Sequence, residues 1–264
     1  MTLTKRALLA STVALATAMS LGHAQAQTAL DGVMKSKLIK IAVPTDFPPY
    51  GFVGIDLKPQ GLDVDTANLI AAKLGVQVEL VPVTSANRIP YLQTKKADLV
   101  ISTLGKNPER EKVIDFTVAY SPFFQAVYGP KSMALADFNA LGGKSIAVTR
   151  GAIEDQELTK VVPANTDVKR FEDNNATVSA FVSGQTQFIA TGVSVADNMI
   201  KRNPALGAEY KLLLKDSPNF IGVAKGEDAL RTKVNEVILA AKKAGEIDAL
   251  AKKWLGRPAG NLPE

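Results

Sequence analysis

Three arginines stand beside predicted helix starts, each just after the predicted end of a strand. They are Arg88 in "TSANRIP", Arg110 in "STLGKNPER" and Arg150 in "TRGAIED". The partial positive charge of a helix N-terminus disfavours a cation by a few tenths of a kcal/mol up to about 1 kcal/mol. A bound anion offsets that cost, and a carboxylate fits both the guanidinium fork and the free N–H groups of a helix start. Because ligands of open α/β sheets sit beyond the carboxyl ends of the strands, the three arginines predict one site for a carboxylate-bearing ligand.

Surface ion pairs are the alternative explanation for these arginines, because such pairs are common and contribute little to stability. Arg88 has no acidic neighbour close in sequence. The other two have several: Glu109, Glu111 and Asp115 near Arg110, and Glu154 and Asp155 near Arg150. An ion pair explains Arg110 slightly better when it is considered singly, whereas three arginines at three strand ends favour a shared ligand.

Aromatic and acidic residues near the same strand ends have two interpretations each. Phe47 and Tyr50, in a proline-rich loop after the first strand, either stack on a ligand or form a rigid plug in the core. Asp63 and Asp65 in "GLDVD" resemble half a calcium loop, but no further ligands follow at the required spacing. We interpret them as acidic residues at a helix start, which complement the helix dipole.

The composition excludes several classes of chemistry. The 264 residues include no Cys and one His, His23, which lies in a predicted signal peptide. Without Cys or His, the rest of the chain cannot form a His-assisted nucleophile, a His/Cys zinc site or a disulfide framework. We predict no cofactor and no metal. The formal net charge of +5 is small and the lysines are scattered, so no nucleic-acid partner is predicted.

Residues 1–26 have the pattern of a secretory signal peptide. Lys5 and Arg6 precede the apolar run "ALLASTVALATAMSL", and the stretch Ala24-Gln25-Ala26 supplies a cleavage site. The apolar run is shorter than the roughly 20 residues that a membrane-spanning helix needs. The chain has no Cys for a lipid anchor, and we predict a soluble protein of the periplasm.

Short β-branched segments alternate with helical patterns in two successive halves of the chain. In the helical pattern at 62–75, apolar residues recur on one side and Gly75 supplies the stop. Alternation of this kind predicts an α/β fold with parallel sheets covered on both faces. Extended stretches at 116–132 and 210–226 predict two crossings between the halves.

The two crossings divide the chain into two expected lobes. Lobe 1 is expected at 27–122 and 219–264, and lobe 2 at 123–218. The last pattern, 227–256, predicts two helices that pack on a core.

Five stretches carry a resemblance to a known family: "IAVPTDFPPYGF", "GLDVDTANLIAAKLGVQVELVPV", "IPYLQTKKADLVIST", "NPEREKVIDFT" and the terminal "AKKWLG". In content and order they resemble the periplasmic solute-binding proteins of polar amino acid ABC transporters, family 3, over essentially the whole chain after the signal. The resemblance implies the two-lobed periplasmic-binding-protein fold (Venus flytrap, type II), with two extended hinge crossovers and lobes that close on a small ligand. It also implies a partner, the transmembrane permease of an ABC importer.

The resemblance implies roles for individual residues. Arg110 matches the arginine that grips the ligand's α-carboxylate, and Thr103 matches a hydroxyl position beside it. The stretch "TSANRIP" resembles the glutamate- and aspartate-binding members, in which the Ser and Arg of this motif meet the ligand's side-chain carboxylate. Those residues are Ser85 and Arg88 here. Phe47 matches an aromatic position in the first loop.

The chain departs from the family pattern at three positions. Gly105 replaces a usual Ser or Thr, and Ile153 stands where a Thr usually helps to hold the carboxylate. Gly192 falls where an aspartate usually pairs with the ligand's α-ammonium, a charge-assisted bond worth roughly 1.5–3 kcal/mol. Two explanations remain open. Either the ligand has no α-ammonium, or a nearby acid substitutes, the candidates being Asp46, Glu154 and Asp155.

The sequence thus predicts a binding protein and not an enzyme. We expect it to capture a small carboxylate-bearing solute, most simply an amino acid. The resemblance of "TSANRIP" to the glutamate- and aspartate-binding members suggests an acidic amino acid. We expect it to act as a monomer. The predicted ligand-binding residues are Asp46, Phe47, Tyr50, Ser85, Arg88, Thr103, Gly105, Arg110, Arg150, Ala152, Ile153, Thr191 and Gly192. The alternative is an exported enzyme similar to the cyclohexadienyl and arogenate dehydratases, with Glu154 or Asp155 as its acid.

Overall fold

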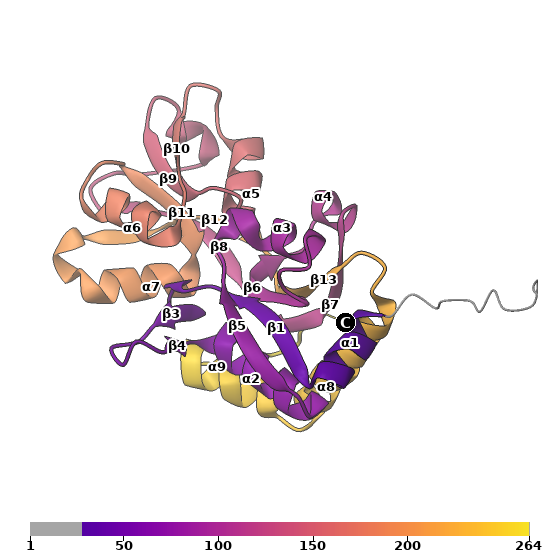
Figure 1. The fold of residues 1–264 in the computed structure, drawn as a ribbon. Helices are drawn as coiled ribbons and strands as arrows, with labels where there is room; N and C mark the ends of the chain where they lie inside the picture. Colours follow the sequence, from indigo (N-terminus) through magenta and orange to yellow (C-terminus); the bar gives the residue numbers. More distant parts are fainter. Residues whose placement is uncertain (1–27, 264) are drawn as a thin grey trace, which may run out of the picture.

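The computed structural model describes residues 28–263, which form two lobes, each built on a five-stranded sheet (Figure 1). The predicted signal peptide, residues 1–26, lies outside the described residues. Within residues 28–263, no helix combines the length and the apolar character that a bilayer span requires.

The sheet of the first lobe has the strand order β5-β1-β6-β13-β7. β1 pairs in parallel with β5 and β6, and β13 pairs antiparallel with β6 and β7. The strands are β1 (Leu38–Val43), β5 (Gln77–Pro82), β6 (Leu99–Gly105), β7 (Ile114–Ser121) and β13 (Asn219–Ala224). The helices of this lobe are α1 (Ala29–Ser36), α2 (Leu62–Leu74), α3 (Arg88–Gln93), α4 (Pro108–Glu111), α8 (Asp228–Lys243) and α9 (Glu246–Leu255), and a 3-10 turn, η1 (Ser85–Asn87), precedes α3.

The sheet of the second lobe has the strand order β10-β9-β11-β8-β12. β9 pairs in parallel with β10 and β11, and β8 pairs antiparallel with β11 and β12. The strands are β8 (Phe124–Pro130), β9 (Ser145–Thr149), β10 (Asp167–Phe171), β11 (Phe188–Gly192) and β12 (Ala208–Asp216). The helices are α5 (Ile153–Val161), α6 (Asn174–Val182) and α7 (Val193–Arg202), with 3-10 turns η2 (Phe138–Leu141) and η3 (Pro204–Leu206).

A small three-stranded sheet stands beside the first lobe, next to the space between the lobes (Figure 1). It consists of β2 (Asp46–Phe47), β3 (Gly51–Val53) and β4 (Pro59–Gln60). β2 follows β1 directly, so it places Asp46 and Phe47 at the carboxyl end of that strand.

The chain passes from the first sheet to the second between β7 and β8, and returns between β12 and β13. These two connections confirm the predicted extended crossovers. We propose lobe boundaries at 27–122 with 219–264, and at 123–218, because β7 and β13 belong to one sheet and β8 and β12 to the other.

The cores follow the apolar patterns of the sequence. Ala67, Ile70, Ala71 and Leu74 of α2 are buried, and the helix ends at Gly75, which has the left-handed φ of 69° that favours glycine. The main cluster also includes Ile153 and Val195 from helices of the second lobe. The lobes are therefore packed against each other in this structure.

Candidate ligand-binding site

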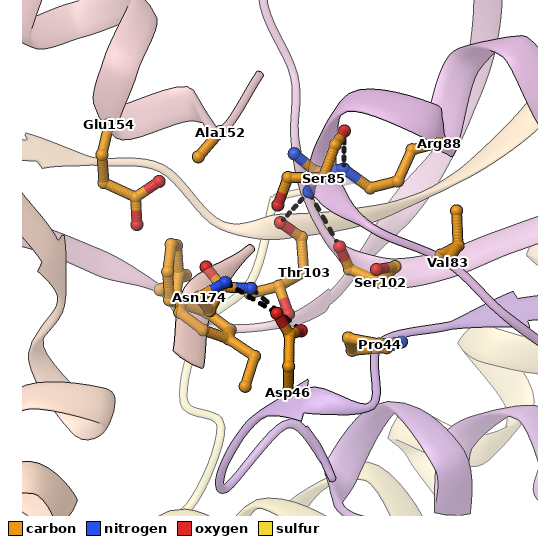
Figure 2. A pocket seen from close by; sticks show the side chains of 12 residues that line it. Pro44, Asp46, Val83, Ser85, Arg88, Ser102, Thr103, Ala152, Glu154 and Asn174 are labelled. Carbon is orange, nitrogen blue, oxygen red and sulfur yellow. Dashed lines mark hydrogen bonds between the residues drawn. The ribbon is translucent and has the colours of Figure 1, made fainter. Parts of the chain in front are cut away.

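The carboxyl ends of strands from both sheets meet at a small cavity between the lobes. Its lining residues come from both lobes. Those of the first lobe are Pro44, Asp46, Phe47, Val83, Ser85, Arg88, Ser102 and Thr103, and those of the second lobe are Phe123, Ala152, Glu154 and Asn174 (Figure 2). The cavity volume is ≈ 20 Å³, which is about the space that one water molecule needs. A ligand as large as an amino acid therefore requires the lobes to separate and close again around it.

Arg88 is the central cation of this cavity and is only 4% exposed. It opens α3, and its guanidinium donates four hydrogen bonds, all to backbone carbonyls: from Nε to Ser85 (3.0 Å), from Nη1 to Ser102 (2.9 Å) and Thr103 (3.1 Å), and from Nη2 to Gly151 (3.0 Å). A guanidinium has five N–H groups, so one Nη2 hydrogen has no acceptor in residues 28–263. Burial lowers the pKa of Arg88, whereas the charges of Glu154 and Asp63 raise it.

Arg110 lies beside this arrangement and is 3% exposed, but it does not line the cavity. Asn107 caps the helix start by accepting from the Arg110 N–H at 2.9 Å, as the sequence predicts. The Arg110 side chain donates to the Gly105 carbonyl at 2.6 Å and to the Gly151 carbonyl at 3.0 Å. Burial lowers its pKa to about 9, so it keeps its charge at neutral pH. Arg88 and Arg110 thus share the carbonyl of Gly151, which belongs to the other lobe.

The ion-pair explanation for Arg110 is wrong in this structure. Each of its three acidic neighbours in sequence pairs with a lysine instead: Glu109 with Lys112, Glu111 with Lys106 and Asp115 with Lys225. Asn107 and Pro108 start a short helix, and Arg110 in its first turn donates to Gly151 of the second lobe instead.

Arg150 is not brought to the cavity, which corrects the prediction of three converging arginines. Its backbone N–H donates to the Phe171 carbonyl, and its side chain, 50% exposed, pairs with Glu172 at 2.8 Å. Its partner is therefore neither Glu154 nor Asp155. Arg150 directly follows β9, beside the end of β10, and its side chain is directed to Glu172, which follows β10.

Asp46 connects the two lobes through the start of α6. Its carboxylate accepts from the backbone N–H of Asn174 at 2.7 Å and from the side-chain amide of Asn174 at 3.1 Å (Figure 2). An acidic group at a helix N-terminus is favourable. Both carboxylate oxygens of Asp46 thus accept hydrogen bonds from the second lobe. Asn174 lines the cavity and was not among the residues predicted from the sequence. The signal was available, because "RFEDNN" places Asn174 at a helix start after the strand β10.

The aromatic residues divide between the two interpretations. Phe47 lines the cavity, whereas Tyr50 is 1% exposed and lies behind it. Tyr50 packs edge-on against Phe123 at 5.3 Å between ring centroids, and Phe47 stacks on Tyr50 at 5.9 Å. The plug interpretation therefore describes Tyr50, and Phe123, which the sequence reasoning did not select, completes the aromatic wall.

Thr103 and Ser85 meet Arg88 through their backbone and not through their hydroxyls. Thr103 has a φ of 47°, and its hydroxyl donates to the buried carboxylate of Asp63 at 2.9 Å. Asp63 also accepts from Tyr120 at 2.6 Å. The metal-loop alternative is wrong, because Asp63 supports the end of β6, and Asp65 accepts from Lys253 and Trp254.

Of the remaining predicted residues, Ala152 lines the cavity, whereas Gly105, Ile153, Thr191 and Gly192 do not. Ile153 is buried and faces Gly105, where a Cβ would lie 3.3 Å from the Ile153 side chain. Thr191 is buried in β11. Asp155 pairs with Arg170 at 2.7 Å.

Gly192 has no room for a side chain. A Cβ at this position would lie 2.5 Å from the ring of Phe123, so an aspartate cannot be accommodated unless the ring moves. The packing of Phe123 against position 192 therefore favours glycine there over the aspartate of the family pattern.

Replacing Gly192 by alanine is expected to destabilise the protein by about 1–3 kcal/mol, as overpacking usually does. Urea unfolding measures this change. Because the clash involves a single ring, the double variant G192A/F123L is expected to be more stable than the sum of the single effects predicts. Additive effects would show that Phe123 is not what excludes a side chain at 192.

Comparison with known proteins identifies the family. The family model of the bacterial extracellular solute-binding proteins, family 3, matches residues 39–257. The chain belongs to this family. Among its relatives, the ABC transporter glutamine-binding protein GlnH of Bacillus subtilis (strain 168) is 29% identical over 203 residues, 74% of this chain and 72% of that protein. The L-cystine-binding protein TcyJ of Escherichia coli (strain K12) is 26% identical over 246 residues, 92% of each chain.

Solved structures agree with this assignment. An ancestral arginine-binding protein bound to arginine has a TM-score of 0.79 and 32% identity, over 83% of this chain and 99% of that one. An ancestral amino acid-binding protein, a precursor of cyclohexadienyl dehydratase, has a TM-score of 0.79 and 30% identity, over 85% of this chain and 98% of that one. The chain is thus a family 3 solute-binding protein, and the relatives named above are amino acid-binding proteins.

Proposed function

We propose that this protein captures a small amino acid between its two lobes and delivers it to the permease of an ABC importer, outside the cytoplasm. The single observation that carries the proposal is the cavity at the facing strand ends, with the buried Arg88 on its wall. The relatives named for glutamine and cystine, and the structural neighbour bound to arginine, support an amino acid as the ligand.

The ligand carboxylate is assigned to the arginine side of the cavity. Arg88 retains one N–H without an acceptor in the described residues, and Arg110 holds a second positive charge next to it. A carboxylate that reaches these groups gains charge-assisted hydrogen bonds, which are about twice as strong as neutral ones. We assign the α-carboxylate to Arg110 and the far end of the ligand to Ser85 and Arg88, as the sequence resemblance implies, and an acidic amino acid is the ligand that this assignment favours.

We propose that the two lobes move apart to admit the ligand and then close on it. Closure forms the contacts seen here, namely Arg88 and Arg110 with Gly151, Asp46 with Asn174, and Asn107 with Gln156. Because the cavity seen here has room for about one water molecule, we propose that the ligand stabilises a closed state with a wider cavity, by its differential affinity for that state.

A thermal-shift screen of the purified protein against the L-amino acids, dicarboxylates and 2-oxo acids tests this function. Binding of a ligand to the folded state raises the melting temperature; at a ligand concentration of 100 times Kd the folded state gains about 2.7 kcal/mol. We expect one chemical group of L-amino acids, led by the acidic ones, to raise it. Absence of any shift across the amino acids would reject the proposal.

A further inference from the structure

A buried glutamate, Glu154, lines the cavity. Gly192 has no room for an acidic side chain, since a Cβ there meets the ring of Phe123 at 2.5 Å. A ligand ammonium group therefore needs another partner. Three acidic side chains are candidates: Asp46 in β2, and Glu154 and Asp155 in the first turn of α5.

Two of these acids are already occupied. Asp46 accepts from the Asn174 N–H at 2.7 Å and from its amide at 3.1 Å, so both oxygens are used by the start of α6. Asp155 pairs with Arg170 at 2.7 Å, and its other oxygen accepts from the Gly151 N–H at 3.4 Å. Each oxygen of these two carboxylates therefore already has a donor within the protein.

Glu154 differs from both. It is the second residue of α5, it is 4% exposed, and it lines the cavity. Its Oε1 is buried without a hydrogen-bond partner among residues 28–263. Figure 2 shows its carboxylate directed from α5 into the space between the lobes, across from Thr103 and Arg88.

The simplest structural explanation is that Glu154 is an internal counter-ion of the two buried arginines. Their charges do lower its pKa, although burial raises it by more. However, both guanidiniums direct their hydrogen bonds to backbone carbonyls, and neither forms an ion pair with Glu154 in the described residues. A buried carboxylate oxygen without a donor, such as Oε1 of Glu154, is costly, so its position is explained better by a donor that arrives with the ligand.

We propose that Glu154 binds the ammonium group of the ligand, in place of the aspartate that the family usually carries at position 192. This inference rests on the proposed function and makes it more specific. The ligand is a zwitterion whose carboxylate faces the arginines of the first lobe and whose ammonium faces Glu154 of the second lobe. Such a ligand connects the two lobes through its two charges, which couples binding to closure.

Glu154→Gln tests this assignment, because the amide has the same shape and no charge. Calorimetric titration uses matched probe pairs that differ only in the ammonium group: L-glutamate with glutarate, L-glutamine with glutaramate, and L-arginine with 5-guanidinopentanoate. In the wild-type protein, we expect the amino member of at least one pair to bind more tightly. In E154Q, the affinity for that member is expected to fall by about 10- to 100-fold, the loss of a charged hydrogen bond, while the deaminated member changes by less than about 3-fold.

Glu157→Gln is the matched control. Glu157 lies one turn along the same helix and pairs with Lys160 and Lys215 away from the cavity. This variant is expected to bind both members of a pair as the wild type does, and the melting temperature of each unliganded variant verifies its folding.

The outcomes separate this inference from the proposed function. Wild-type protein that binds none of the probes or any other amino acid contradicts the proposed function. Wild-type protein that prefers the deaminated members, or E154Q that keeps the full preference for the amino member, overturns the role of Glu154 and leaves the carboxylate site standing.

Discussion

Replacement of Arg88 by methionine is expected to lower the free energy of unfolding by at least about 3 kcal/mol. The side chain holds four backbone carbonyls, of Ser85, Ser102, Thr103 and Gly151. A buried acceptor that loses its partner costs about 1–3 kcal/mol, and methionine fills the space without offering a donor. Ligand binding is expected to be lost as well, because the Gly151 contact between the lobes and the cation of the cavity disappear together.

Arg150→Met is the control for that variant, because it also replaces an arginine, the one that follows β9 of the second lobe. Arg150 forms an exposed pair with Glu172, and such pairs contribute about 0–1 kcal/mol. Urea unfolding of the two variants gives the comparison. Equal stability of R88M and R150M would mean that the buried guanidinium does not organise the cavity.

Asp63 is expected to make the protein less stable as the pH rises from about 4 to 6. Burial raises its pKa from 3.8 to about 6, against the hydrogen bonds from Tyr120 and Thr103, which lower it. Between these two values the folded state binds the proton and the unfolded state does not. Stability contributed by the protonated carboxyl is therefore present below about pH 4 and lost as the pH rises through 6.

Asp63→Asn removes this titration. The pKa difference corresponds to about 3 kcal/mol, so the wild-type protein should lose up to that amount between pH 4 and pH 7 relative to D63N. Urea unfolding at both pH values measures the difference. The exposed carboxylate variant Asp167→Asn serves as the control and should follow the wild type; a pH profile of D63N identical to that of the wild type would exclude Asp63 as the source.

The fold was predictable because its signals are local. Apolar spacing and a following glycine define α2 and its end at Gly75, and the same spacing places Val234, Val237 and Ile238 of α8 in the core, where they are buried. Alternation of strands and helices predicts the parallel pairs. The family assignment follows from stretches whose order is preserved along the chain.

The site was predictable only in part, because its contacts join segments far apart in sequence. Arg88 reaches Gly151 across 63 positions and Asp46 reaches Asn174 across 128, and no local pattern indicates that their bonds go to a backbone carbonyl and a helix start. The sequence also could not show that Arg150 turns outward to Glu172. The ligand-binding roles, the signal peptide and the monomeric state stay predictions.

Calorimetric titration of the wild-type protein with an amino acid and with its α-amide tests the central claim most directly. L-Glutamate and L-glutamine are the first probes, followed by whichever amino acid raises the melting temperature most. The amide keeps the ammonium and the side chain but removes the charge that the arginines are proposed to bind. We predict that the amide binds at least about 10-fold more weakly, the loss of a charge-assisted hydrogen bond. Equal affinities for the acid and the amide would contradict a carboxylate site between the lobes.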